Sequence, residues 1–291
     1  LGLTTPLEQI LKKAGITCIV YKDTVANPTS ANVEDAKNLY LKKHCQALLA
    51  FGGGSSMDCA KGVGARLARP NKSLAKMEGI LHVMHKLPLL IAVPTTAGTG
   101  SETTLAAVIT DADTHHKYAI NDFSLIPHYA VLEPEVTVGL PAQLTATTGM
   151  DALTHAIEAY IGRSTTKQTR KAAIEAIQLI FQYLPVAYKN GKNRTARKEM
   201  LRASYLAGTA FTKSYVGYVH AVAHSLGGQY GIPHGLANSV LLPIVLEAYG
   251  NAAHKKLAHL ARITKLSSSP DDTTAANAFI AHIRKMNASM N

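Results

Sequence analysis

The chain has 291 residues, of which 47% are hydrophobic and 17% charged, a composition typical of one large or two ordinary globular domains. This balance excludes a disordered protein, and a membrane-spanning protein is excluded because no apolar run is long enough to cross a bilayer. The formal net charge of +11 comes from basic residues scattered over amphipathic helices with little aromatic interleaving, which argues against nucleic acid as a partner.

The start of the chain and its cysteines bear on where the protein works. No basic-plus-apolar leader is visible, and three cysteines are too few, and odd in number, for a disulfide framework. We therefore expect a cytoplasmic protein with reduced thiols. The chain begins at Leu1 rather than at a methionine, which predicts further residues upstream.

Residues 1–140 alternate between helical and strand patterns. Thr5-Pro6-Leu7-Glu8 is a capping box with proline at the first helical position, and it predicts a helix to about Ala14. Further helices are predicted over Ser30–Lys43 and from Ser55, as the N-cap, to about Leu67. Strands that alternate with helices predict parallel pairing with helices on both faces, a doubly wound α/β domain. The apolar runs that predict these strands are 16–21, 46–51, 87–93, 104–110 and 130–132.

Beyond Leu140-Pro141 the pattern changes, and only helical periodicity follows. The predicted fold is therefore an α/β domain over residues 1–140 followed by an all-α domain over residues 141–291. The helices of this second domain are predicted over 142–160, 167–184, 197–211, 216–230, 237–249, 253–264 and 271–286.

Two polar loops follow predicted strands in the first half. Gly52-Gly53-Gly54-Ser55 opens a helix, and the backbone N–H groups at a helix N-terminus favour an anion such as a diphosphate. Taken alone, this loop is equally an ordinary tight turn, since it is neither a Rossmann fingerprint nor a Walker loop. Pro94–Glu102 adds hydroxyls and free N–H groups where a doubly wound sheet binds its ligand, so the two loops together favour a dinucleotide. Asp58 is interpreted as a further capping residue of the helix.

Two histidine-bearing segments in the second half predict a metal site. Asp151 and His155 stand four residues apart, so on a helix both side chains project from one face. His220 and His224 repeat this spacing, and His234 follows in an Ile-Pro-His-Gly turn. One carboxylate and several imidazoles suit a divalent transition metal with room for a substrate oxygen. Standing alone, Asp151 and His155 would equally be an intrahelical hydrogen-bonded pair.

Four segments together resemble the iron-containing (group III) alcohol dehydrogenases. They are GGGSSMDCAK from residue 52, PTTAGTGSE from residue 94, GMDALTHAIEAY from residue 149 and GYVHAVAHSLGG from residue 217. The likeness runs in order from about residue 3 to 290. It implies an N-terminal dinucleotide-binding domain and a C-terminal helical domain that holds the metal and the substrate. Family members also begin earlier and continue past Asn291, so segments are expected to be missing at both ends.

Roles for individual residues follow from this resemblance alone. Asp151, His155, His220 and His234 would be the metal ligands. His224 would be an additional active-site histidine, either a proton carrier toward solvent or a residue that positions substrate or cofactor. The implied metal is Fe²⁺, although Zn²⁺ fits the same ligands. The cofactor is NAD or NADP, and the residues expected to contact it are Asn27, Gly53, Gly54, Ser55, Thr95, Thr96, Thr99, Thr104, Lys117, Val136 and Gly139.

The function predicted is that of a metal-dependent oxidoreductase, which transfers a hydride between NAD(P) and a small primary alcohol or diol, or its aldehyde. We expect a homo-oligomer with no nucleic-acid or membrane partner. Three alternatives stay open: a zinc polyol dehydrogenase such as glycerol dehydrogenase, a dehydroquinate-synthase-like lyase of the same fold, and an inactive cofactor-binding fragment. The PTTAGTGSE loop together with Asp-x-x-x-His favours the alcohol dehydrogenase.

Overall fold

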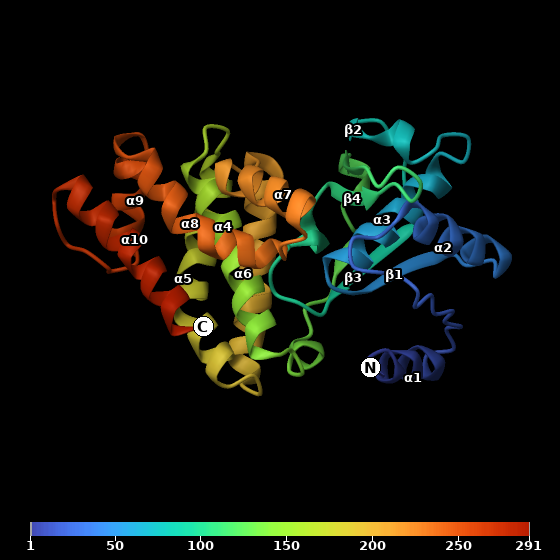
Figure 1. Ribbon diagram of the computed structural model, residues 1–291. Coiled ribbons are helices and arrows are strands. Elements are labelled where there is room, and N and C mark those ends of the chain that lie inside the picture. Colours follow the sequence, from blue (N-terminus) through green and yellow to red (C-terminus); the bar gives the residue numbers. More distant parts are fainter. Residues whose placement is uncertain (1, 291) are drawn as a thin grey trace. The chain divides into compact units, whose positions relative to one another are not determined.

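The computed structural model describes residues 2–290, and contacts within the chain divide it into two compact units (Figure 1). The first unit runs to Thr95 and resumes over Ser101–Val136. The second unit contains the loop Thr96–Gly100 and the chain from Thr137 onward. Helices and strands alternate in the first unit, whereas the regular structure described in the second is helical. The predicted fold class, α/β followed by all-α, is confirmed.

The helices of the first unit begin in different ways. Helix α1 (Thr5–Lys13) carries the predicted proline in its first turn, but its N-cap is Thr4 and no side chain caps it, so the predicted capping box is wrong. Helix α2 (Ser30–Lys42) begins at a reciprocal capping box between Thr29 and Asn32. Helix α3 (Gly54–Ala68) follows the glycine turn, and its N-cap is Gly53. The prediction of Ser55 as N-cap is wrong, because Ser55 already lies inside the first helical turn.

Two three-stranded sheets form around α3. Strands β1 (Ala47–Gly52), β3 (Leu89–Pro94) and β6 (Tyr129–Ala130) are parallel in the order β1-β3-β6. The second sheet has the order β2-β5-β4, with β2 (Gly79–Ile80) parallel to β5 (Lys117–Asn121) and β4 (Ala106–Thr110) antiparallel to it. The predicted parallel pairing is therefore wrong for β4. The Asp111 carboxylate accepts the N–H groups of Asp113 and Thr114, which turns the chain straight back into β5.

The first strand predicted, Ile16–Tyr21, is also wrong. This segment forms no ladder with a described strand, and its side chains from Ile16 to Val20 are exposed. An apolar alternation becomes a strand only where a neighbour pairs with its backbone groups and covers one face. No described segment does so for these residues.

Helix α3 contributes buried side chains to the hydrophobic clusters beside both sheets of the first unit. Met57 packs with Ala50 and Leu90 beneath β1 and β3. One turn and a half later, Val63 belongs to a larger buried cluster with Ile109 of β4. Because one helix packs against both sheets, the glycine turn that begins α3 has a defined position in this unit.

Helix α4 (Ala142–Ile161) is the central element of the second unit, and it is buried without interruption from Gly149 to Tyr160. A helix that is buried on all sides must be covered by neighbours. The main neighbours of α4 are α5 (Lys167–Lys189), α6 (Arg194–Ser214) and α8 (His234–Tyr249). Helix α7 (Tyr218–Tyr230) packs on α8, and α9 (Asn251–Ile263) packs on α10 (Asp272–Ser289), as the orange and red ribbons of Figure 1 show.

Three helix boundaries differ from the prediction in informative ways. Helix α5 continues through Pro185 to Lys189, although the prediction ended it at Leu184. Helix α8 begins at His234, which was predicted to lie in a turn ahead of a helix starting at Ala237. Helix α10 extends to Ser289 rather than Met286. Among the described residues, no helix is both long and apolar enough to cross a membrane.

Candidate metal centre and nucleotide loops

Three acidic and imidazole side chains lie along one face of the buried helix α4. Asp151, His155 and Glu158 follow one another at spacings of four and three residues, so they project from the same side of the helix. All three residues are almost fully buried. A buried carboxylate is costly unless positive charge or hydrogen bonds compensate it, so the neighbours of this face decide what it can do.

Helices α7 and α8 bring two further histidines to Asp151. The His220 Nε2 atom lies 3.7 Å from Asp151 Oδ1, and His234 Nε2 lies 3.5 Å from the same oxygen. One ligand atom from each of the three residues falls within 4.8 Å of the others, a spacing suited to a shared metal ion. His220 is buried, whereas 40% of the His234 side chain is exposed, so the group is open on one side.

His155 stands beside this group. Its Nδ1 atom lies 4.0 Å from Asp151 Oδ1, and its ring stacks on His220 and on Phe211 with centroid distances of 4.3 and 4.1 Å. The structure therefore gathers Asp151, His220 and His234 as one potential ligand set and holds the fourth predicted ligand in contact with it. That His155 itself ligates the metal stays a prediction.

Several buried polar atoms at this place have no hydrogen-bond partner among the described residues. They are His155 Nδ1, His220 Nε2 and Asn238 Oδ1. Leaving a buried polar atom unpaired costs about 1–3 kcal/mol, so such atoms seldom gather without reason. A cation held by carboxylate oxygen and imidazole nitrogen would satisfy the two unpaired nitrogens, and the residues present thus fit a divalent transition metal.

Burial and neighbouring charges shift the pKa values of Asp151, His155 and His220. Burial raises the pKa of Asp151, but its interactions with the imidazoles of His155, His220 and His234, a hydrogen bond from His220 among them, outweigh this effect and hold that pKa well below the ordinary value. Burial lowers the pKa of His155 to about 3, so this imidazole is neutral. For His220, burial is outweighed by Asp151 and Glu158, which raise the pKa to about 9. Metal binding at His220 is therefore coupled to release of a proton.

Two residues that the sequence analysis did not single out position these ligands. Asn238, on α8 one turn beyond His234, donates from Nδ2 to Asp151 Oδ1 at 2.7 Å and lies 3.1 Å from His234 Nε2. Glu158 lies 2.6 Å from His220 Nδ1. The spacing carried a signal in both cases, because Asn238 stands four residues after His234 and Glu158 stands three after His155.

His224 is exposed on α7, one turn beyond His220. The centroid of its ring lies 6.2 Å from that of His220 and 5.1 Å from that of His234. It is therefore the predicted residue on the exposed side of the ligand group. Its role as proton carrier or positioning residue stays a prediction.

In the first unit, three predicted cofactor residues from distant parts of the sequence meet at the start of α3. The Asn27 backbone N–H donates to Ser55 Oγ at 3.3 Å, and Lys117 Nζ donates to Asn27 Oδ1 at 2.8 Å. A lysine thus stands beside the glycine turn whose N-cap, Gly53, offers no side-chain acceptor. Positive charge and helix N–H groups at one place suit a phosphate group.

The other predicted cofactor residues divide between the two units. Thr95, Thr104 and Val136 belong to the first unit with Gly54, whereas the second unit contains Thr96, Thr99 and Gly139. Thr104 Oγ1 accepts a hydrogen bond from buried Lys61 at 2.9 Å. The structure gives no ligand contact for any of these residues, so their roles stay predictions.

Lys61 is a third residue that the sequence analysis missed. Its Nζ atom is buried and donates to Ser101 Oγ, to both oxygens of Thr104 and to the Ala106 carbonyl at 2.9–3.0 Å. Asp58 does not cap α3 as predicted. Its two carboxylate oxygens accept from Ser101 Oγ and from the Val108 N–H, and together with Lys61 it ties α3 to β4 and to the segment that precedes this strand.

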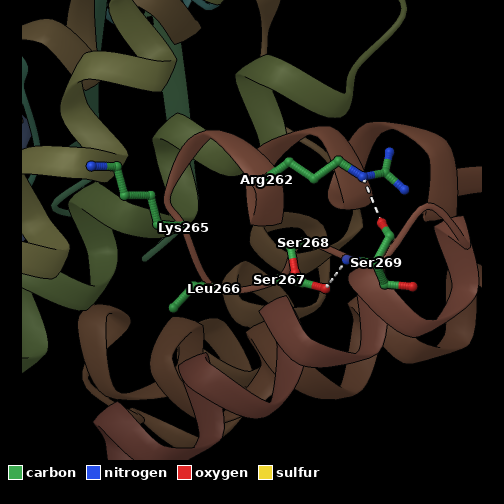
Figure 2. Close-up of a pocket in the computed structure, with 6 residues that line it drawn as sticks. All are labelled: Arg262, Lys265, Leu266, Ser267, Ser268 and Ser269. Carbon is green, nitrogen blue, oxygen red and sulfur yellow. Dashed lines mark hydrogen bonds between the residues drawn. The ribbon is translucent and has the colours of Figure 1, made fainter.

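A cavity of about 730 Å³ lies elsewhere in the second unit, at the corner between α9 and α10 (Figure 2). Arg262 closes one side by donating to the Ser269 carbonyl, and Ser267–Ser269 line the rest with Lys265 and Leu266. None of the predicted metal or cofactor residues lines it. Large volume alone therefore does not mark the functional centre of this protein.

Comparison with known families shows which family this chain belongs to. A family model described as iron-containing alcohol dehydrogenase matches residues 1–134. A second model, the C-terminal domain of the Fe-containing alcohol dehydrogenase family, matches residues 145–291. The chain belongs to the iron-containing alcohol dehydrogenase family. The four motifs noted in the sequence thus indicated the family correctly.

Similar proteins are recorded within the iron-containing alcohol dehydrogenases. A 1,3-propanediol dehydrogenase of Citrobacter freundii is 44% identical over 86% of this chain and 65% of its own length. An NAD-dependent methanol dehydrogenase of Bacillus methanolicus is 38% identical over 94% of this chain and 72% of its own. A crystal structure of 1,3-propanediol oxidoreductase superposes with a TM-score of 0.97 at 38% identity, covering all of this chain and 76% of that one. The chain thus spans about two thirds of the length of the propanediol dehydrogenase.

Proposed function

We propose that this protein is a metal-dependent oxidoreductase that transfers a hydride between a nicotinamide cofactor and a small primary alcohol or diol, or the corresponding aldehyde. The observation that carries the proposal is the buried Asp151 carboxylate, whose Oδ1 atom lies 3.5–4.0 Å from nitrogens of His234, His220 and His155. Asp151, His155, His220 and His234 would hold the cation. When bound, a divalent metal supplies a Lewis acid that favours the ionised form of an alcohol.

The protein's own residues prepare this site. Asn238 holds Asp151 and His234 together through its amide, and burial keeps His155 neutral, the form in which an imidazole can ligate a metal. The exposed side of His234 leaves room for a substrate to approach. His224, which lies next to His234 and is exposed, would pass the alcohol proton to solvent.

The nicotinamide cofactor is the second part of the proposal. Its diphosphate would lie at the N-terminus of α3, against the backbone of Gly53 and Gly54, with Lys117 supplying positive charge. This assignment is supported by the gathering of Asn27, Ser55 and Lys117 at that turn. We propose NAD rather than NADP as the first cofactor to test, because a relative 38% identical to this chain is named an NAD-dependent methanol dehydrogenase.

The proposed substrates and metal rest on the relatives. Two of them act, by name, on 1,3-propanediol and on methanol, so short primary alcohols and diols are the class to test. Iron is proposed from the family, and zinc suits the same nitrogen and oxygen ligands. A homo-oligomer and a location in the cytoplasm are parts of the same proposal, and sedimentation analysis of the purified protein tests the first of these.

The deciding experiment follows reduced-nicotinamide absorbance with methanol, ethanol, 1,3-propanediol and their aldehydes, using NAD and NADP in turn. Enzyme as purified is compared with enzyme stripped by a chelator and reloaded with Fe²⁺ or Zn²⁺. Activity that disappears on stripping and returns with metal supports the proposal. Full activity in the stripped enzyme contradicts the metal's role, and cofactor binding without turnover indicates an inactive cofactor-binding fragment. His234→Ala, which removes one of the expected ligands, should lose most of this activity, whereas His254→Ala, at a histidine of α9 away from the ligands, should retain it.

A further inference from the structure

The carboxylate of Glu158 receives three hydrogen bonds that meet at the first turn of α7. Glu158 Oε2 accepts from the Gly217 N–H at 2.8 Å, and Oε1 accepts from the Val219 N–H at 2.7 Å. The third partner is His220 Nδ1, at 2.6 Å from Oε2. Glu158 itself is 2% exposed and comes from the last turn of α4. One buried side chain of α4 therefore joins the helix that carries Asp151 to the helix that carries His220.

These contacts fix which nitrogen of His220 bears a proton. A carboxylate that already accepts two backbone N–H groups acts as an acceptor toward the ring, so His220 Nδ1 is the donor. A neutral imidazole has one N–H and one lone pair. In this neutral form, which His220 takes when it binds a metal, Nδ1 keeps the proton and the lone pair lies on Nε2, the atom 3.7 Å from Asp151 Oδ1.

The backbone at Gly217 is shaped for this carboxylate. Gly217 is the N-cap of α7 and has no side chain to satisfy the first N–H groups of the helix. A Cβ atom there would lie 2.8 Å from Glu158 Oε1 and 3.2 Å from its Cδ, closer than real Cβ contacts allow. Glu158 thus replaces a local cap, and the glycine lets it approach closely enough to reach His220.

We propose that Glu158 is a positioning residue for the metal centre: it fixes the Nδ1–H tautomer and the orientation of His220, so that Nε2 is presented toward Asp151 as a ligand atom. This inference rests on the proposed function, because it takes His220 to be a metal ligand. It goes further by assigning metal affinity to a residue that is not itself a ligand. Residues hydrogen-bonded to metal-ligating histidines contribute about 10- to 100-fold to metal affinity.

The test measures Co²⁺ binding to the whole protein by competition with a coloured chelator and by the visible absorption of the bound ion. In Glu158→Gln the shape is retained, but the amide has one oxygen in place of two and no negative charge. It can no longer accept from Gly217, Val219 and His220 together, so the Nδ1–H tautomer of His220 loses its charged acceptor. We expect Co²⁺ to bind about 10- to 100-fold more weakly, with a changed absorption band. Glu158→Asp keeps the charge but withdraws the carboxylate from the ring, and it gives a usable answer where Glu158→Gln does not fold.

The matched control removes hydrogen bonds from the same helix one turn further along, at its C-terminus. Lys256 Nζ donates to the Ile161 and Gly162 carbonyls at 2.7 and 2.8 Å, capping the C-terminus of α4. Lys256→Met should lower the unfolding temperature of the metal-free protein and leave Co²⁺ affinity and absorption as in the wild type. A Glu158 variant that behaves in the same way would overturn the inference, since Glu158 would then be a structural cap only.

The outcomes also separate this inference from the proposed function. Weak Co²⁺ binding in the Glu158 variants, with tight binding in the wild type and in Lys256→Met, supports the inference whether or not the wild type turns over an alcohol. Tight Co²⁺ binding without any turnover contradicts the proposed function alone. A wild-type protein that binds no Co²⁺ contradicts both.

Discussion

A buried carboxyl group in the first unit makes its stability depend on pH in a predictable direction. Glu102 is 3% exposed, and its Oε1 atom has no hydrogen-bond partner among the described residues. Burial raises its pKa to about 7 from an ordinary value of 4.5, although its own backbone N–H and the charge of Lys61 oppose the change. The substitution that tests this environment is Glu102→Gln, which keeps the shape and removes the titration.

The expected magnitude follows from the two pKa values. Because the folded pKa is higher than the unfolded one, the folded state holds its proton longer, so stability is full below pH 4.5 and is lost as pH rises through about 7. A difference of about 2.5 pKa units corresponds to about 3 kcal/mol at 1.36 kcal/mol per unit. Lys61 acts in the opposite direction, because burial lowers its pKa from 10.5 to about 8. Its contribution to stability is full above about pH 10.5 and is lost as pH falls through about 8.

Hydrogen exchange measured by mass spectrometry, under conditions where exchange reports the opening equilibrium, resolves the two units separately. Peptides from α3 and β4 should show the variant and the wild type as equally stable at pH 4.5. At pH 7.5 the variant should be more stable by up to about 3 kcal/mol. Peptides from α10 serve as the internal control and should not differ between the two proteins. A difference in stability between the wild type and Glu102→Gln that stays the same from pH 4.5 to 7.5 would refute the reasoning.

Three further predictions concern the loop, the metal ligands and the cofactor turn. Gly100 has φ +60°, and a Cβ atom there would lie 2.7 Å from the backbone of α6. Gly100→Ala should therefore lower the stability of α6, measured by hydrogen exchange, by about 2–5 kcal/mol. Gly228→Ala, which has open space around it, is the control and should not lower this stability. His234→Ala should weaken Co²⁺ binding by more than about tenfold in chelator competition with little loss of stability, because its side chain is partly exposed; unchanged affinity would exclude it as a ligand. Lys117→Met should raise the KM for the nicotinamide cofactor by about tenfold and leave Co²⁺ affinity unchanged. An unaltered KM would show that Lys117 and its partner Asn27 do not contribute to binding the diphosphate.

The sequence predicts the helices and the ligand types well because both depend on local spacing. Asp151 and His155 share a helix face at a spacing of four, and the structure places them on the buried face of α4. What joins them to His220 and His234 depends on how three helices pack. Glu158 and Asn238 were missed although each stands one helical turn from a predicted ligand, because their partners belong to other helices.

The strands were predicted less well, because a strand is defined by its neighbour. Ile16–Tyr21 is as apolar as β1, yet no described segment pairs with it and it forms no strand. Strand β5 was not predicted, since Lys117–Asn121 is short and only the Asp111 turn that precedes it creates the antiparallel pair with β4. Pro185 misled the prediction in the other direction, because α5 continues past it. Packing against α4 and α6 compensates for the backbone hydrogen bond that a proline cannot donate.

The central claim is that Asp151, His220 and His234 hold one divalent cation. Anomalous scattering from crystals loaded with Fe²⁺, recorded on both sides of the iron absorption edge, tests it most directly. We predict a single strong peak about 2.0–2.2 Å from Asp151 Oδ1 and from the Nε2 atoms of His220 and His234. Iron bound at another place, or no peak at these residues in crystals of the loaded protein, would contradict it.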